Sequence, residues 1–489
     1  MYTCADNGKM TQDSEKFKIR RKPGLGYRLL RAYADPAFLA SYSRVQYVGL
    51  ENIPKDCAVI FAPNHTNGLM DPLAAMSLGR RFAPMIFAAR ADMFRIPLLR
   101  GLLRFLYVTP VMRIRDGYSH LEENEDIMSA VSDRLCDGIP YCIMAEGTQR
   151  DRHSLLPLRK GIFRVALMAD DKLDERMPMM IVPVGIEYGN YYRYRTSMLL
   201  NVGRAMNVSE FRRAHTGLTQ PELMNAMREE LASELKSLYL SIDDDADYDG
   251  VLEICRIVSE DSLSNSPARI GTLGKRDRNA MICGKFSLYD RMIRDKAAAE
   301  WLYSLRDSGS PEYGRLVRLG SEAFSIRMRS RISAASYSVD FRSQFFFLKH
   351  CSGSKALGIM FLALTFPYWI FSILVTSPVL LLAEVLCRVQ TDRAFLISLR
   401  YAVAALTLPL LAIVWATILF TGIPGRLWWV SVLLLLLFCP AYTFAHDWFK
   451  AVRLSVSEFK FRQDRRLVEI VSEVRECVQN VFYKNENNK

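Results

Sequence analysis

The C-terminal part of the chain contains three long runs of apolar residues. The first run, residues 356–383, has no charged side chain, and residues 401–420 and 427–445 form the second and third runs. Each approaches or exceeds the roughly 20 residues that a helix needs to cross the hydrocarbon core of a bilayer. Soluble domains rarely contain three such runs, so we expect an integral membrane protein.

The last two apolar runs are joined only by residues 421–426, which predicts an antiparallel pair of membrane helices. A full crossing by the first run would then place the N-terminal region on the opposite side of the membrane from both flanks of this pair. Pro367 and Pro378 could instead bend that run into a re-entrant or interfacial element, so both topologies stay open. Basic residues on the two flanks place them in the cytoplasm by the positive-inside rule: Arg388, Arg393, Arg400, Lys450, Arg453, Lys460 and Arg462.

Residues 57–190 alternate short runs of β-forming residues with longer stretches of mixed polarity. This alternation predicts an α/β domain with a mixed central sheet flanked by helices. The expected strands are residues 58–62, 85–89, 141–145 and 181–188.

Most of residues 205–350 have the spacing and charge of helices. A Thr cap, a Pro and helical apolar spacing predict one helix within residues 219–242. The tail presents one apolar face, made by Ile470, Val471, Val474, Val478 and Val481. We therefore expect a basic interfacial segment (1–47), the α/β domain (48–240), a mainly helical extension (241–352), a membrane domain of two to three apolar helices (353–446) and a basic tail with an amphipathic helix (447–489).

Composition narrows the class of protein further. The 489 residues include 64 Lys and Arg against 52 Asp and Glu, a formal net charge of +12, and half of the residues are hydrophobic. Disordered and collagen-like classes are excluded. The 10 Cys contain no C-x-x-C pair, which argues against a disulfide framework or a structural zinc site. Because the positive charge is spread along a chain with apolar runs, we expect membrane lipid rather than nucleic acid as its partner.

The residues that follow the first expected strand are candidates for chemistry. In the segment APNHTNGLMDP, residues 62–72, a strand delivers His65 into a turn where Gly68 can supply a positive φ. Asp71 followed by Pro72 reads as the N-cap of a helix. An imidazole paired with a carboxylate can remove a proton from an alcohol. Six helical steps would separate the two side chains by 240°, so a contact between His65 and Asp71 requires the turn.

A second group of candidates follows later strands. The segment AEGTQRD, residues 145–151, could form an anion-binding loop from backbone N–H groups and a guanidinium. Arg113 and Lys160 add cations near the same region. Several cations around one cleft suit a phosphate. We expect the other histidines, including His153, at the surface, and we expect no metal or cofactor.

Four blocks in this order resemble the PlsC-type glycerolipid acyltransferase family, here its extended, membrane-anchored branch. They are an Asn-His block with a downstream Asp, an Arg-ended block, a Glu-Gly-Thr block and a Val-Pro block, and the resemblance covers roughly residues 25–240. It implies a glycerol-3-phosphate acyltransferase-like fold. The matching positions are Asn64, His65 and Asp71; Arg113; Glu146, Gly147 and Thr148; and Val182, Pro183 and Val184.

The resemblance also implies a reaction and residue roles. His65 would act as the general base on an acceptor hydroxyl and Asp71 would orient it, while the hydroxyl attacks the thioester of acyl-CoA or acyl carrier protein. The acceptor would be glycerol-3-phosphate or 1-acylglycerol-3-phosphate, and the location a bacterial inner membrane with the catalytic domain on the cytoplasmic side. Its binding residues would be Asn64, Arg113, Glu146, Gly147, Thr148, Arg150 and Lys160.

The chain departs from the family pattern at three points. Five residues instead of the commoner four separate His65 from Asp71, Ala145 replaces the usual Pro before Glu146, and Gln149 replaces the usual Arg after the Thr. Two alternatives therefore stay open. One is an acyltransferase that uses another lysolipid or an aminolipid as acceptor, and the other is a non-catalytic, lipid-binding membrane scaffold.

Overall fold

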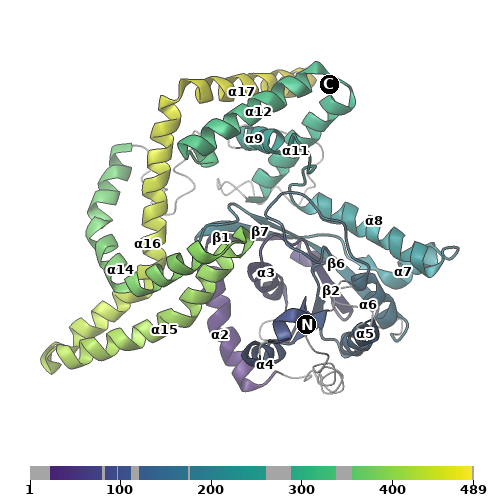
Figure 1. The fold of residues 1–489 in the computed structure, drawn as a ribbon, viewed down its shortest axis with the longest axis horizontal. Helices are drawn as coiled ribbons and strands as arrows, with labels where there is room; N and C mark the ends of the chain where they lie inside the picture. Colours follow the sequence, from purple (N-terminus) through teal and green to yellow (C-terminus); the bar gives the residue numbers. More distant parts are fainter. Residues whose placement is uncertain are drawn as a thin grey trace, which may run out of the picture. The chain divides into compact units, whose positions relative to one another are not determined.

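The computed structural model describes residues 23–79, 83–95, 97–111, 121–173, 177–259, 288–337 and 355–486. The chain divides into two compact units (Figure 1). Met1–Tyr239 and Cys387–Ala402 form the first unit, and Leu240–Leu386 and Val403–Lys489 form the second. The polypeptide therefore returns to the first unit for one short stretch before it ends in the second.

The first unit is built on a mixed sheet, as the sequence predicts, and this sheet has eight strands. The strand order is β1-β7-β6-β2-β5-β3-β4, and β8 pairs with β6. Neighbouring strands are parallel except where β6 pairs with β7 and with β8. The strands are β1 (Tyr42–Val48), β2 (Ala58–Pro63), β3 (Ile86–Arg90), β4 (Val108–Val111), β5 (Tyr141–Cys142), β6 (Met179–Tyr188), β7 (Thr196–Val202) and β8 (Met206–Asn207).

The strand β2 is continuously apolar, as expected for a strand that lies between two parallel neighbours and is covered on both faces. Every residue of β2 is buried. The predicted strands at residues 58–62 and 181–188 are confirmed, and the run at 85–89 forms β3, shifted by one residue. The run at 141–145 forms a strand over only two residues, and β1, β4, β7 and β8 were not expected.

Helices pack against this sheet around one apolar core, which includes Ile60, Ile181, Leu135 and Phe163. The helix expected within residues 219–242 is confirmed, because α8 begins after Thr219 with a capping box to Glu222. The helices of this unit are α2 (Leu25–Ala40), α3 (Met70–Leu78), α4 (Pro97–Phe105), α5 (Leu121–Cys136), α6 (Gly161–Asp170), α7 (Val208–Ala214) and α8 (Gln220–Leu238).

The second unit contains a helical core with a buried ion pair. Arg327 donates to both carboxylate oxygens of Glu253, at 2.6 and 2.8 Å, and the Tyr337 hydroxyl donates to the same carboxylate. The expected apolar face of the tail helix contributes Ile470, Val471 and other residues to this core. The helices are α9 (Tyr248–Ser259), α11 (Leu288–Asp307), α12 (Pro311–Ser330) and α17 (Arg465–Glu486).

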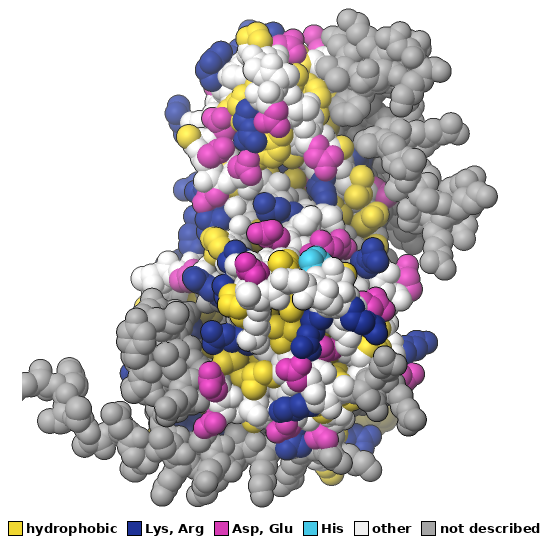
Figure 2. Space-filling model, turned by 90° about the vertical axis from the view of Figure 1, so that its right-hand side faces the viewer, with side chains coloured by type: hydrophobic (Ala, Val, Ile, Leu, Met, Phe, Trp, Pro, Cys, Tyr) yellow, Lys and Arg dark blue, Asp and Glu magenta, His cyan; other side chains and the backbone are white. Residues whose placement is uncertain are grey.

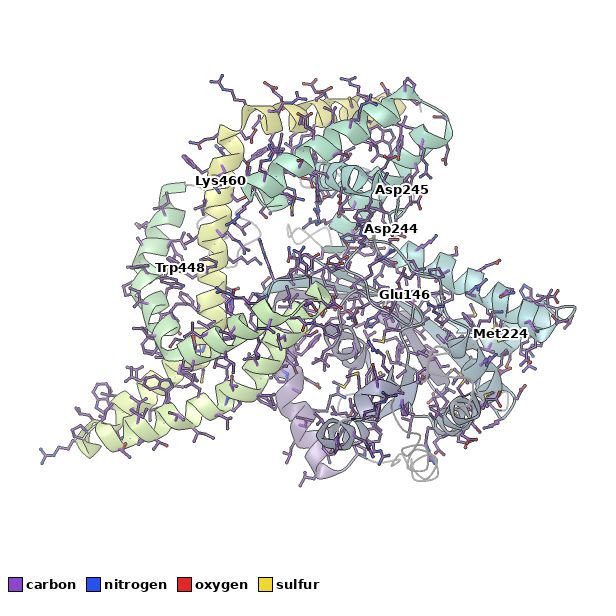
Figure 3. All side chains as sticks on the ribbon, viewed as in Figure 1. Glu146, Met224, Asp244, Asp245, Trp448 and Lys460 are labelled. Carbon is purple, nitrogen blue, oxygen red and sulfur yellow. The ribbon has the colours of Figure 1, made fainter. Side chains whose placement is uncertain are left out.

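Among the residues that the structure describes, three helices are long and apolar enough to cross a membrane, as the apolar runs predict. They are α14 (Lys355–Val389), α15 (Leu396–Gly422) and α16 (Trp428–Gln463). The helix α14 is continuous through Pro367 and Pro378. It packs against α16, where Trp448 stacks on Trp369 with 4.4 Å between ring centroids and donates to the Leu362 carbonyl (Figure 3).

Basic and acidic side chains are interspersed over the face of the molecule in Figure 2. A nucleic-acid interface would instead gather Lys and Arg into a patch or stripe. The described residues on this face therefore carry no extended region of a single sign of charge.

Candidate active site

The loop after β2 carries the candidate catalytic residues. The strand ends at Pro63 and α3 begins at Met70, so the intervening loop lies beyond the carboxyl end of a central strand, where α/β sheets commonly bind ligands. Asn64, at the start of the loop, is buried. Its Oδ1 accepts from the Ile186 amide at 2.6 Å and its Nδ2 donates to the Ile186 carbonyl at 3.1 Å. The Asn64 side chain therefore anchors the loop to β6.

The structure brings His65 and Asp71 together through this loop. The Nδ1 atom of His65 lies 2.9 Å from Oδ2 of Asp71. Because an ionised carboxylate only accepts hydrogen bonds, Asp71 holds the imidazole proton on Nδ1 and leaves Nε2 with a lone pair. About 15% of the His65 side chain is exposed, whereas Asp71 is fully buried. This is the arrangement of a general base and its orienting carboxylate.

Three further donors hold the Asp71 carboxylate. Its Oδ2 accepts from the backbone amides of Thr66 and Asn67 at 2.8 and 2.7 Å. Its Oδ1 accepts from the Tyr188 hydroxyl at 2.6 Å. A buried charge is costly unless hydrogen bonds compensate for lost water, and here the loop's own amides supply them. The same bonds close the turn that brings His65 to Asp71.

Two local expectations about this loop are wrong. Asp71 lies in the first turn of α3 and is not its N-cap, which is Leu69. The Asp71 carboxylate accepts hydrogen bonds from the backbone amides of Thr66 and Asn67 in the loop, and so it does not cap the helix. Gly68 does not adopt a positive φ. It is required for space, because a Cβ atom there would lie 2.4 Å from a ring carbon of Phe395.

Glu146 joins the His65 loop to a second loop. Its Oε1 accepts from the His65 amide at 2.7 Å, and its Oε2 accepts from the Leu156 amide at 2.9 Å. The carboxylate of Glu146, which is labelled in Figure 3, therefore accepts hydrogen bonds from backbone amides of two different segments. Burial raises its pKa to about 7, although both hydrogen bonds act in the opposite direction.

The remaining predicted binding residues lie at different distances from the pair. The amide of Arg150 donates to the His65 carbonyl at 3.2 Å, and its guanidinium donates to Ser154. Gly147, with a φ of 69°, and Thr148 are exposed on the same loop. Lys160 immediately precedes α6, and Arg113 lies outside the described residues.

Sequence reasoning missed several residues that support the pair. Tyr188 ends the predicted strand at 181–188, but nothing in the sequence places its hydroxyl on Asp71. Burial first, and the Asp71 charge second, raise the pKa of Tyr188 well above 10, so it acts as a donor. His153 is buried, contrary to the surface location expected, and its Nδ1 lies 3.1 Å from the Tyr191 hydroxyl. Its neighbours come from β6 and the following loop, which no local pattern reveals.

Comparison with known proteins adds the reaction class. Residues 44–187 match a family model described as Acyltransferase. These residues are an acyltransferase domain. A solved structure, the 1-acyl-sn-glycerophosphate (LPA) acyltransferase PlsC from Thermotoga maritima, is similar at 20% identity over 43% of this chain and 79% of that chain, with a TM-score of 0.30. No curated protein matches the chain.

The match includes both members of the His65–Asp71 pair, together with Glu146 and Arg150. Within the described ranges, no group of three or more His, Cys, Asp or Glu side chains is placed to hold a metal ion. The chemistry that the His65–Asp71 arrangement can perform is acid–base chemistry.

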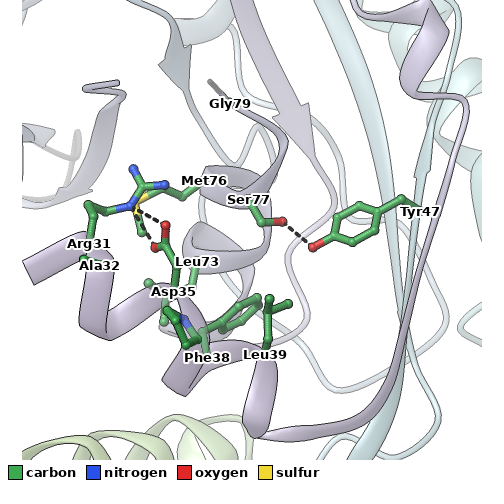
Figure 4. Close-up of a pocket in the computed structure, with 11 residues that line it drawn as sticks. Arg31, Ala32, Asp35, Phe38, Leu39, Tyr47, Leu73, Met76, Ser77 and Gly79 are labelled. Carbon is green, nitrogen blue, oxygen red and sulfur yellow. Dashed lines mark hydrogen bonds and ion pairs between the residues drawn. The ribbon is translucent and has the colours of Figure 1, made fainter. Parts of the chain in front are cut away.

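A pocket of about 270 Å³ lies beside the acyltransferase domain's α3 (Figure 4). Residues of α2 and α3 and the side chain of Tyr47 line it, and its walls are largely apolar. Two polar pairs interrupt the apolar lining. Arg31 donates to Asp35 at 2.8 Å, and the Tyr47 hydroxyl donates to Ser77 at 3.1 Å.

The raised pKa of Glu146 predicts a pH-dependent stability of the acyltransferase domain. A carboxyl with a pKa of 4.5 in the unfolded chain and about 7 in the folded one binds its proton more tightly when folded. The stabilising contribution of the Glu146 carboxyl to the free energy of unfolding is thus fully present below about pH 4.5 and is lost as the pH rises through 7. The shift corresponds to roughly 3 kcal/mol of unfolding free energy.

Glu146→Gln removes this titration, so the variant should gain stability relative to the unaltered protein as the pH rises from 4.5 to 7. Thermal midpoints of the two proteins in detergent, measured across pH 4.5–8, test this. The deciding quantity is how the difference between the two thermal midpoints changes with pH. Its absolute value is less informative, because the Gln side chain has one acceptor fewer than the carboxylate at every pH. Parallel curves would show that Glu146 does not titrate in this range.

Proposed function

We propose that this protein is a membrane-bound O-acyltransferase of phospholipid biosynthesis. It transfers a fatty acyl group from acyl-CoA or acyl carrier protein to glycerol-3-phosphate or 1-acylglycerol-3-phosphate. The observation that carries the proposal is the 2.9 Å contact between His65 Nδ1 and Asp71 within an acyltransferase domain, which leaves Nε2 to accept a proton.

The reaction needs one proton carrier and no covalent intermediate on the enzyme. Nε2 of His65 takes the proton of the acceptor hydroxyl as its oxygen attacks the thioester carbonyl carbon. Asp71 stabilises the imidazolium that forms. The tetrahedral intermediate collapses by breaking the carbon–sulfur bond, and the leaving thiolate takes the proton from His65. One ester forms, one thioester breaks, and His65 returns to its starting state.

Membrane attachment places this chemistry next to lipid substrates. Besides the three long apolar helices, α2 exposes Leu25 and Leu29, with 71% and 61% of their surface accessible. The helix α2 packs on α4 through Tyr27 and Phe105, whose ring centroids are 6.3 Å apart. Exposed apolar side chains on the same helix as the exposed Arg28 suit an interfacial helix on an anionic membrane. A bacterial inner membrane with the acyltransferase domain on the cytoplasmic side agrees with the basic flanks of α15 and α16 on condition that α14 does not cross the bilayer fully.

The second candidate changes only the acceptor. Gln149 stands where the resembled family usually has Arg after the Thr, and its Nε2 donates to Asp392 at 3.2 Å. The next residue, Arg150, carries a guanidinium, which is bonded to Ser154. A neutral side chain at this position favours an acceptor without a phosphomonoester, such as another lysolipid or an aminolipid.

The test is acceptor-dependent release of free thiol from acyl-CoA and acyl carrier protein by the purified, detergent-solubilised chain. We expect turnover with glycerol-3-phosphate or lysophosphatidate. Turnover only with aminolipids or with lysophospholipids other than lysophosphatidate would establish the second candidate. No thiol release with any donor and acceptor would contradict both and leave the lipid-binding scaffold.

A further inference from the structure

The short stretch that returns to the first unit contacts the catalytic loop. Residues 387–402 include the end of α14, the turn η8 (Arg393–Phe395) and the beginning of α15. The apolar pattern assigns this stretch to the membrane region, as a connection between two apolar helices. In the structure it belongs to the compact unit that contains the acyltransferase domain.

Ser398 makes the central contact of this stretch. It is 4% exposed. Its hydroxyl accepts from the amide of Leu69 at 2.9 Å and donates to Oδ1 of Asn67 at 3.0 Å. Nδ2 of Asn67 in turn donates to the Tyr191 carbonyl at 3.3 Å. A single hydroxyl from α15 therefore satisfies one donor and one acceptor of the catalytic loop.

The Ser398 contacts lead directly to the proposed base. Asn67, whose side chain Ser398 holds, donates its own amide to Asp71 at 2.7 Å. Leu69, whose amide donates a hydrogen bond to Ser398, is the N-cap of the helix that carries Asp71. Ser398 thus fixes the loop at two points on either side of Gly68, without touching His65 or Asp71.

Phe395 packs on the same loop. A Cβ atom at Gly68 would lie 2.4 Å from Cε1 and 2.6 Å from Cδ1 of the Phe395 ring. Contacts this short do not occur for real Cβ atoms, so the glycine and the ring are matched to each other. Any larger side chain at position 68 must displace the ring or the loop.

Two further contacts connect this stretch to neighbouring loops. Arg400 donates to the Tyr192 carbonyl at 2.7 Å, and the Arg393 guanidinium lies 4.3 Å from the centroid of the Tyr192 ring. Asp392 accepts from Gln149, one residue before Arg150. Residues 392–400 therefore contact the loops that follow β2, β5 and β6 together.

We propose that Ser398 is a positioning residue for the His65–Asp71 pair and that residues 392–400, which include the first turn of α15, complete the active site. Its hydroxyl holds the turn at residues 67–69, and Phe395 fills the space that Gly68 leaves. The base thus depends on a segment more than 320 residues away in the sequence that leads directly into an apolar helix. The kinetic part of this inference rests on the proposed acyl transfer.

The kinetic experiment compares Ser398→Ala with Ser372→Ala in the full-length protein in detergent. Ser372 is a matched control, because it is also a buried helix serine, and its hydroxyl donates to the Tyr368 carbonyl of its own helix. We expect Ser398→Ala to lower kcat about tenfold, as for loss of a buried hydrogen-bonding group. KM for the acyl donor should stay unchanged, and Ser372→Ala should retain the original kcat. Equal kcat values for both variants would overturn the proposal.

Hydrogen exchange gives a readout that does not depend on activity. In Ser398→Ala the Leu69 amide loses its acceptor, so peptides covering residues 64–72 should exchange faster than in the unaltered protein or in Ser372→Ala. Unchanged exchange would overturn the inference even if no acyl transfer were found. An inactive unaltered protein with faster exchange in Ser398→Ala would contradict the proposed function alone.

The fit of Gly68 to Phe395 gives an independent check. Gly68→Ala should lower kcat, because the new methyl group displaces the loop that carries His65. Phe395→Ala removes the atoms that the methyl group meets, so the double variant should recover a large part of the lost kcat. Additive losses in the double variant would show that the segment does not position the loop.

Discussion

Replacing His65 by Ala should lower kcat about a hundredfold or more, the usual loss when a general base is removed. The substitution leaves the acceptor hydroxyl without a group to take its proton. KM for the acyl donor should change little, since the imidazole acts on the acceptor. The measurement is acceptor-dependent thiol release by the purified protein.

His215→Ala is a suitable control for this substitution. His215 follows α7, where its ring stacks on Phe211 and its Nδ1 bonds to the Phe211 carbonyl. This variant removes an imidazole from the same unit but outside the catalytic loop, and it should keep its activity. A His65→Ala variant with more than a third of the original kcat would assign the base to another residue.

Asp71→Asn should also lower kcat, by about 10² to 10⁴, because a neutral amide cannot stabilise the imidazolium. The amide oxygen can still accept from Thr66 and Asn67, and its NH2 group can face Tyr188. We therefore expect the fold to survive while the chemistry fails. Kinetics and the thermal midpoint should be measured together on the same preparation.

Tyr188→Phe gives a graded comparison. It removes the bond to Oδ1 of Asp71 and leaves the contacts of His65, Thr66 and Asn67 on Oδ2. We expect a loss of about tenfold, well below that of Asp71→Asn. An Asp71→Asn variant no worse than Tyr188→Phe would show that the negative charge of Asp71 is not needed.

The sheet was only partly predictable, for reasons that particular strands make clear. Continuous apolar runs mark β2 and β6, which are buried on both faces. The edge strand β1 is largely exposed or half-buried and lacks such a run. The strand β5 comprises only Tyr141 and Cys142, since the chain turns there toward the loop that carries Glu146.

The roles of the motif residues were less predictable than their positions. The motif indicates that Asn64 and Glu146 bind substrate, but the structure places both side chains on backbone groups of neighbouring elements. Residue type does not distinguish a carboxylate that faces a ligand from one that accepts hydrogen bonds from two backbone amides. That distinction depends on which loops meet at the end of the sheet.

The amino-acid sequence by itself determined the α/β domain, three helices apolar enough to cross a membrane, and a His65–Asp71 pair that needs a turn to meet. Each follows from local information, because the periodicity of apolar residues, the length of the apolar runs and the order of the motifs can be read directly from the sequence. Only the tertiary structure decided that Tyr188 and the loop amides hold Asp71. It also decided that Ser398 and Phe395 reach the loop from the start of α15. The contacts of Tyr188, Ser398 and Phe395 join segments far apart in the sequence, so no local pattern along the chain indicates them.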